Sequence, residues 1–347
     1  MTTLAQFHDA LLLDLDGTVY LGGQVIPHVV DVLIQAAARG ARPVFITNNA
    51  SRPPAEVAAA LNGMGVAAVE SDVLTSPQAA AAMLAGTHSP GSAVLIVGAK
   101  ALSDAVADVG LIPVRLASEN PVAVVQGHSP DTGWRDLAEA CIALRTGVDW
   151  VASNTDTTLP TDRGLLPGNG AMVQALVAAT GRTPRVAGKP NRPLLDEAVS
   201  RFASERPLVV GDRLDTDIEA AMLAGLPSLL VFTGVANATD LLAAPASRRP
   251  TYISFDLRGL VDVDLVAEIA AGHPGWCVQD GEHQLVLTSA GSPGSSDDGG
   301  ALRALAALAA RSWATGVRQV RAGDEPATAV LARFGLASVA AVDGATR

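Results

Sequence analysis

The sequence predicts an α/β protein built on a parallel sheet, with a second α/β domain inserted into it and a small α/β domain appended. Short apolar runs alternate with helical patterns at the start of the chain, and this rhythm returns from Leu208. The chain has 347 residues, which is too long for one typical core. We therefore expect two or three domains.

The first block predicts two strands that each lead into a polar residue. Ala10–Leu13 is a short apolar run ending at Asp14, and Pro43–Ile46 is a second run ending at Thr47. Helical periodicity over Val29–Arg39 separates them and stops at a glycine. This order predicts neighbouring parallel strands covered by helices.

The later block repeats the pattern. Leu208–Val210 predicts a strand that ends just before Asp212, and Thr216–Ala224 predicts a helix closed by a glycine. Two further apolar runs, Leu229–Phe232 and Tyr252–Phe255, predict the last strands of this sheet.

A separate α/β region lies between the two blocks. Val94–Val97 and Val122–Val125 predict strands, and Trp134–Arg145 predicts a helix. The stretch Asn154–Gly170 is rich in turn formers, so we expect a long loop there, followed by a helix over Ala171–Thr180. A long loop inside a compact domain is often functional.

The tail has a pattern of its own. Trp276–Val278 and Gln284–Thr288 predict a hairpin across Asp280-Gly281, and Ala236–Pro250 before it reads as a connector. After a glycine-rich loop, Ala290–Gly300, we expect helix, strand, helix and strand over Ala301–Trp313, Val317–Val320, Pro326–Phe334 and Ala337–Val342. The expected domains are a core of residues 1–74 and 186–262, an inserted domain of residues 75–185, and an appended domain of residues 263–347.

Composition excludes several classes of partner. The net charge of −11 argues against a nucleic-acid partner. The sequence has no signal peptide and no apolar stretch of membrane-spanning length, so we expect no membrane partner. Cys141 and Cys277 show no metal-type spacing, which fits buried thiols in a reducing, cytoplasmic environment. A homo-oligomer is left open.

Polar residues at the ends of predicted strands define a candidate site. Asp14 and Asp16 follow the first strand, Thr47 follows the second, and Asp212 follows a later strand. Ligands of open α/β sheets bind beyond the carboxyl ends of strands, so these side chains should converge on one cleft. Lys189, just before a helical stretch, is one of only two lysines among 24 basic residues.

The residue types fit transfer of a phosphoryl group. Asp14 can act as a nucleophile that forms an acyl phosphate, and Asp16 can protonate the leaving group and then deprotonate water. Asp14, Asp212 and the main-chain carbonyl of Asp16 suit the hard oxygen ligation that Mg²⁺ prefers. Thr47 and Lys189 can bind the phosphate oxygens.

These segments resemble the four motifs of the haloacid dehalogenase (HAD) phosphatases. The matching residues are DLDGT at 14–18, Thr47, Lys189 and GDRLDTD at 211–217, and the resemblance covers roughly residues 8–265. It implies a Rossmann-like HAD core. The TNN after the second strand resembles the subfamily with a large α/β (type IIA) cap, which includes nucleotide, p-nitrophenyl phosphate, pyridoxal-phosphate, phosphoglycolate and glycerol-phosphate phosphatases. Residues 75–185 would then be the cap.

The resemblance also implies a role for each matching residue. Asp14 would be the nucleophile and Asp16 the acid and base, with Asp217 orienting the metal shell or Lys189. The implied Mg²⁺ ligands are Asp14, Asp16 and Asp212, and the implied phosphate-binding residues are Thr47, Asn48, Asn49 and Lys189.

Two cap positions bear on the substrate, a small phosphorylated metabolite. Leu159 stands where the pyridoxal-phosphate branch has a histidine, which favours glycerol 3-phosphate or phosphoglycolate. Ser129 replaces an aspartate that is usual in this family. Asn154 and Asp156 could contact substrate or form an Asx turn. A broad-specificity phosphatase for nucleotides or pyridoxal phosphate remains an alternative.

Two other functions are compatible with parts of this pattern. A dehalogenase or phosphonatase could use the same fold, although Asp16 argues against the first. The second would need a Schiff-base lysine in the cap, where Lys100 is the only lysine and is expected to be solvated. A sensor that binds a phosphometabolite and signals through the tail is the non-enzyme alternative.

The tail resembles part of an acyltransferase of the GNAT kind. In that family a glycine-rich loop and a helix N-terminus bind pyrophosphate through N–H groups. Here the loop carries Asp297 and Asp298, which would repel pyrophosphate, and the region is too short for the whole fold. We therefore expect a structural, regulatory or oligomerising domain, and removal of residues 263–347 should spare the chemical step.

Overall fold

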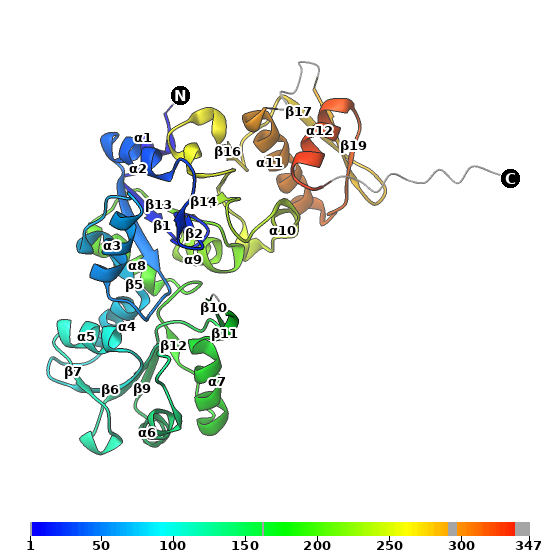
Figure 1. The fold of residues 1–347 in the computed structure, drawn as a ribbon. Helices are drawn as coiled ribbons and strands as arrows, with labels where there is room; N and C mark the ends of the chain where they lie inside the picture. Colours follow the sequence, from blue (N-terminus) through cyan, green and yellow to red (C-terminus); the bar gives the residue numbers. More distant parts are fainter. Residues whose placement is uncertain (1, 162, 291–296, 337–347) are drawn as a thin grey trace. The chain divides into compact units, whose positions relative to one another are not determined.

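The computed structural model describes residues 2–161, 163–290 and 297–336, and its helices and strands alternate along the chain (Figure 1). Contacts divide the chain into two compact units. One comprises Met1–Asp9, Asp16–Ala41 and Leu208–Arg347, and the other comprises Ala10–Leu15 and Arg42–Pro207. Both units contain parallel sheets with helices, so the predicted α/β class is confirmed.

The largest sheet has seven strands in the order β16-β15-β14-β13-β1-β4-β5. β1 (Ala10–Leu13) pairs in parallel with β4 (Arg42–Thr47), which pairs in parallel with β5 (Val73–Thr75). Every residue of β1 is buried, because a central parallel strand is covered on both faces. The predicted strands at Ala10–Leu13 and Pro43–Ile46 are therefore confirmed.

The remaining strands of this sheet follow the later block of the sequence. β13 (Pro207–Gly211), β14 (Ser228–Val231) and β15 (Tyr252–Ser254) pair in parallel order. β16 (Ala267–Glu268) pairs antiparallel with β15 at the edge. Two residues are too few to show a strand pattern, so the sequence did not reveal β16.

Helices occupy the connections between these strands. Where a helix was expected over Thr216–Ala224, the chain first forms a wide π-helical turn, Leu214–Ile218, and then α9 (Glu219–Ala224). In this turn the carboxylate of Asp217 accepts a hydrogen bond from the Arg213 N–H. Further helices before the tail are α1 (Leu4–Phe7), α2 (Val29–Ala38), α3 (Pro54–Gly63), α4 (Ser76–Ala85), α8 (Pro193–Phe202) and α10 (Ala238–Leu242).

The inserted region forms a second sheet of five parallel strands in the order β12-β9-β8-β6-β7. Helix α6 (Trp134–Arg145) has the predicted bounds, and Trp150 is a large side chain buried in this region's core. The strands are β6 (Ala93–Val97), β7 (Ile112–Val114), β8 (Ala123–Gln126), β9 (Asp149–Ala152) and β12 (Arg185–Val186), and the other helices are α5 (Lys100–Asp108) and α7 (Asn169–Thr180).

The turn-rich stretch Asn154–Gly170 is not all loop. It contains an antiparallel hairpin of β10 (Thr158–Thr161) and β11 (Gly164–Pro167). All four residues of β11 are exposed, so this strand lacks the alternation of buried and exposed residues by which a strand is recognised in a sequence.

The tail begins with the predicted hairpin, formed by β17 (Trp276–Asp280) and β18 (Leu285–Ser289). β19 (Val320–Ala322) adds in parallel to β18. Two helices complete the described part, α11 (Asp298–Thr315) and α12 (Glu325–Arg333). The expected strand Ala337–Val342 and most of the expected loop Ala290–Gly300 lie outside the described residues.

The tail shares one hydrophobic core with the segment before it. Leu241 and Leu242 of α10 join Leu302 and Leu305 of α11 in a single buried cluster. The Ser312 hydroxyl also donates to the Leu242 carbonyl at 2.9 Å. The segment expected to be a connector thus contains a helix that packs on the tail. No helix among the described residues is long and apolar enough to cross a membrane.

We predict that Leu305→Ala lowers the free energy of unfolding by about 2–5 kcal/mol, because the change leaves a cavity in this shared core. Chemical denaturation measures the change. The exposed Leu223 provides the control, and Leu223→Ala should change the value by less than about 0.5 kcal/mol. Equal effects of the two substitutions would show that the tail does not share the core.

Candidate active site

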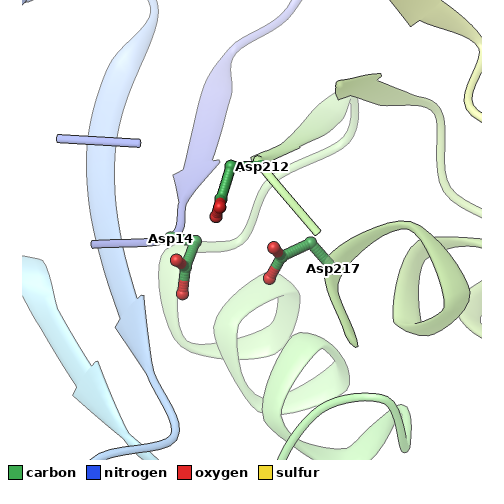
Figure 2. A group of neighbouring side chains, drawn as sticks. All are labelled: Asp14, Asp212 and Asp217. Carbon is green, nitrogen blue, oxygen red and sulfur yellow. The ribbon is translucent and has the colours of Figure 1, made fainter. Parts of the chain in front are cut away.

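Three carboxylates gather beyond the ends of two strands. Asp14 follows β1, Asp212 follows β13, and Asp217 lies in the π-helical turn. Each offers one oxygen, and these oxygens lie within 4.8 Å of one another. Figure 2 shows the three side chains turned toward a common space. Asp212 and Asp217 are almost fully buried, and Asp14 is half-buried.

Such a group favours a divalent cation. Ionised carboxylates this close repel one another, and burial strengthens the repulsion by removing solvent. A donor set made only of carboxylate oxygens is hard, which fits Mg²⁺ and not a soft metal. Asp14, Asp212 and Asp217 are therefore the side chains that could hold it. When bound, the metal neutralises charge on phosphoryl oxygens.

Main-chain groups fix the position of Asp212. Its carboxylate accepts a hydrogen bond from the Val235 N–H at 2.7 Å, and its carbonyl accepts one from the Ala236 N–H at 3.0 Å. Gly17 has a φ of +84°, and a Cβ atom there would lie 2.4 Å from an Asp212 oxygen. A side chain at Gly17 or at Gly234 would displace this carboxylate.

Lys189 supplies the positive charge of the site. Its side chain is only 3% exposed, and its ammonium group forms an ion pair with a carboxylate oxygen of Asp14. A buried lysine requires such a partner, and the pairing favours the ionised form of the nucleophile. Lys100, by contrast, is exposed and pairs with Asp104 on the surface of α5, as expected of a solvated residue.

Asn48 contacts the backbone of Lys189. Its amide oxygen accepts from the Lys189 N–H at 2.9 Å, and its amide nitrogen donates to the Lys189 carbonyl at 2.9 Å. The carbonyl of Asn48 in turn accepts from the Asn154 amide and the Ser76 hydroxyl, both at 2.8 Å. The side chain of Asn48 therefore holds the backbone of Lys189 in place.

Thr47 and Asn49 lie at the end of β4. The Thr47 hydroxyl oxygen accepts from the Asn49 N–H at 3.0 Å. Asn49 is exposed, and its side-chain oxygen accepts from both the N–H and the hydroxyl of Ser51. This oxygen therefore stabilises the turn after β4, and the amide nitrogen is the part of the side chain that can donate to an anion.

Asp16 and Asp217 differ from one another in placement. The side chain of Asp16 is exposed and lies outside the carboxylate cluster, so its expected metal donor is the main-chain carbonyl. Asp217 belongs to the cluster, and the resemblance of residues 211–217 to a HAD motif was what pointed to it. Asp215 faces Arg213, whose hydrogen bond lowers the pKa of that carboxyl group despite partial burial.

The loop after β9 approaches the site through Asn154 and Asp156. The Asp156 N–H donates to the Asn154 side chain at 3.2 Å, which is the Asx turn considered from the sequence. Asp156 also accepts from the Asn48 amide at 3.3 Å. Asn154 is buried, and the Asn169 amide donates to its carbonyl at 2.6 Å. The sequence did not indicate Asn169, whose signal is only its place at the start of α7.

Two family models match the segments that contain most of the large sheet. A haloacid dehalogenase-like hydrolase model matches residues 11–112, and a HAD-hydrolase-like model matches residues 186–260. The chain is also 51% identical to the D-glycerol 3-phosphate phosphatase of Mycobacterium tuberculosis, over 97% of this chain and 96% of that protein.

The chain belongs to the haloacid dehalogenase-like hydrolases. The crystal structure of the Mycobacterium tuberculosis glycerol phosphate phosphatase with magnesium aligns with a TM-score of 0.89 at 51% identity, covering 97% of this chain and 99% of that one. A 4-nitrophenylphosphatase from Thermotoga maritima aligns with a TM-score of 0.68 at 31% identity, covering 74% and 97%. The predicted HAD core is thereby confirmed.

The tail matches a different model. Residues 273–336 match a GCN5-related N-acetyltransferase like domain, which confirms the predicted GNAT-like tail of this HAD hydrolase. The N–H of Gly300, at the start of α11, is already satisfied by the side chain of Asp297. Asp298 pairs with Arg333, so the acidic residues of the expected anion loop have partners within the chain.

We predict that Asn48→Ala reduces kcat about 10- to 100-fold, because the Lys189 backbone loses both hydrogen bonds to this side chain. Steady-state kinetics measures the effect. Asn62→Ala is the matched control, since Asn62 also bonds to main-chain groups but lies on α3, and it should retain kcat. Equal loss in both variants would indicate a general folding defect instead.

Proposed function

We propose that this HAD hydrolase is a Mg²⁺-dependent phosphatase that hydrolyses glycerol 3-phosphate through an aspartyl-phosphate on Asp14. The observation that carries the proposal is the position of Asp14, which pairs with the buried Lys189 and lies within the carboxylate cluster. A carboxylate in such a site can attack phosphorus while its neighbours hold the cation and the phosphate charge.

The proposed reaction has two steps. A carboxylate oxygen of Asp14 attacks phosphorus, the bond to the glycerol oxygen breaks, and Asp16 gives its proton to that oxygen. Asp16, now ionised, takes a proton from water, which attacks phosphorus of the acyl phosphate and releases inorganic phosphate and free Asp14. The exposure of Asp16 supports this role, because the leaving group and the water must both reach it.

The remaining site residues bind and orient in this proposal. Thr47, Asn49 and the ammonium group of Lys189 would hold the phosphoryl oxygens, while Asn48 acts mainly through Lys189. Asp14, Asp212 and the Asp16 carbonyl would ligate Mg²⁺, with Asp217 as a further carboxylate beside them. The hard donor set supports this cofactor.

Two features support the choice of substrate. The similarity to the D-glycerol 3-phosphate phosphatase extends over nearly the whole length of both chains, including the tail. The cap loop carries Leu159, where a pyridoxal-phosphate enzyme would have histidine. We assign residues 75–185 as the cap that selects the leaving group, residues 1–74 and 186–262 as the catalytic core, and residues 263–347 as the appended domain.

The same proposal places the protein in the cytoplasm with no nucleic-acid partner. Both cysteines, Cys141 and Cys277, are free, which suits a reducing compartment. The net charge of −11 disfavours a nucleic-acid backbone.

Phosphate release from a panel of phosphomonoesters tests the proposal. We expect kcat/KM to be highest for glycerol 3-phosphate, ahead of phosphoglycolate, nucleoside monophosphates and pyridoxal phosphate, and EDTA to abolish activity. Asp14→Asn should lower kcat by about 10⁴-fold or more, because the amide is a poor nucleophile. Asp104→Asn, on the surface, should retain activity.

Three results would contradict the proposal. Equal turnover across the panel would indicate a broad-specificity phosphatase. A wild type that binds glycerol 3-phosphate but releases no phosphate would favour the sensor. Full activity of Asp14→Asn would exclude a mechanism that forms an aspartyl-phosphate on Asp14.

A further inference from the structure

The segment after β14 is part of the metal site. From Phe232 the chain turns through Thr233, Gly234 and Val235, and the Val235 N–H holds the Asp212 carboxylate at 2.7 Å. The Thr233 hydroxyl donates to the carbonyl of Gly17. This turn therefore sets the position of a carboxylate in the cluster.

The turn has little packing of its own. Gly234 is exposed, and the side chain of Val235 is 65% exposed, so neither is anchored in a core. Two main-chain bonds hold its first residue, since the Phe232 N–H donates to the carbonyls of Ser254 and Phe255, each at 3.2 Å. Loops with few buried contacts open easily unless a flanking residue is fixed.

The appended domain fixes that flanking residue. Phe334, at the end of α12, meets the ring of Phe232 edge-on, with the ring centroids 6.2 Å apart at 63°. It also stacks on Phe255, with centroids 5.2 Å apart and ring planes at 7°. The Arg333 guanidinium lies 4.7 Å from the centroid of the same Phe255 ring and pairs with Asp298 at the start of α11.

We propose that Phe334 is a positioning residue for the metal site, and that the appended domain acts on catalysis by holding Phe232 and thereby the turn that orients Asp212. The inference rests on the proposed function for its use of Mg²⁺. It assigns the GNAT-like tail a role that needs no ligand of its own. Phe232, Phe255 and Phe334 form the contact, which we call the aromatic brace.

Simple packing is the competing explanation. Phe334 could stabilise the tail alone, since Phe232, Phe255 and Phe334 border the shared core. Any large-to-small change in that core would then have the same consequences as a change at Phe334. The two explanations differ in what happens to Mg²⁺ binding when stability falls by the same amount.

Isothermal titration of Mg²⁺ into the EDTA-stripped full-length protein separates them. We expect Phe334→Ala to raise the Kd for Mg²⁺ about fivefold, a change within the range that the interaction energy of the Phe334–Phe232 ring pair allows. Leu287→Ala is the control, because Leu287 is fully buried in the tail but is not part of the brace. It should lower the melting temperature at least as much and leave the Kd unchanged.

A folded Phe334→Ala protein with the wild-type Kd overturns the inference, as does a Kd that rises equally in both variants. If Phe334→Ala fails to fold, Phe232→Leu weakens the brace from the other side and must raise the Kd in the same way. The titration requires no turnover. An inactive wild type would contradict the proposed function, while an unchanged Kd in Phe334→Ala would contradict only the proposed role of the aromatic brace.

Discussion

Crowding of negative charge around Asp14 is the constraint on which the rest of the site depends. Asp14, Asp212 and Asp217 place oxygens within 4.8 Å of one another, and two of the three residues are almost fully buried. One lysine, Lys189, pairs with Asp14 and offsets only part of that charge. The carboxylate cluster is therefore favourable only with a bound cation. Relief of the repulsion between its carboxylates is the source of the affinity of the site for Mg²⁺.

The fold holds these charged groups close together by fixing them through main-chain contacts. The ends of parallel strands deliver Asp14 and Asp212, and the wide turn after β13 delivers Asp217. The side chain of Asn48 holds both backbone polar groups of Lys189, while the Val235 N–H holds Asp212. Charged groups that are fixed in advance need little reorganisation when a substrate binds, which is the basis of electrostatic catalysis.

Much of this could be predicted from the sequence because the signals are local. A buried strand followed by an aspartate shows in a few residues, so the strands that carry Asp14, Thr47 and Asp212 were found. The role of Asn48 in holding the Lys189 backbone could not be predicted, because its partners Asn154 and Lys189 lie more than 100 residues away in the sequence. The hairpin of β10 and β11 was missed because β11 is wholly exposed. The aromatic brace was missed because its three rings come from segments that are far apart in the sequence.

Thermal unfolding with and without Mg²⁺, for wild type and Asp212→Asn, tests the central claim most directly. The account predicts that Mg²⁺ raises the melting temperature of the wild type. In EDTA, Asp212→Asn should melt higher than wild type, because it removes one of the crowded charges, and it should respond little to Mg²⁺. A wild type indifferent to Mg²⁺, or an Asp212→Asn protein that melts lower in EDTA and still gains from Mg²⁺, would contradict it.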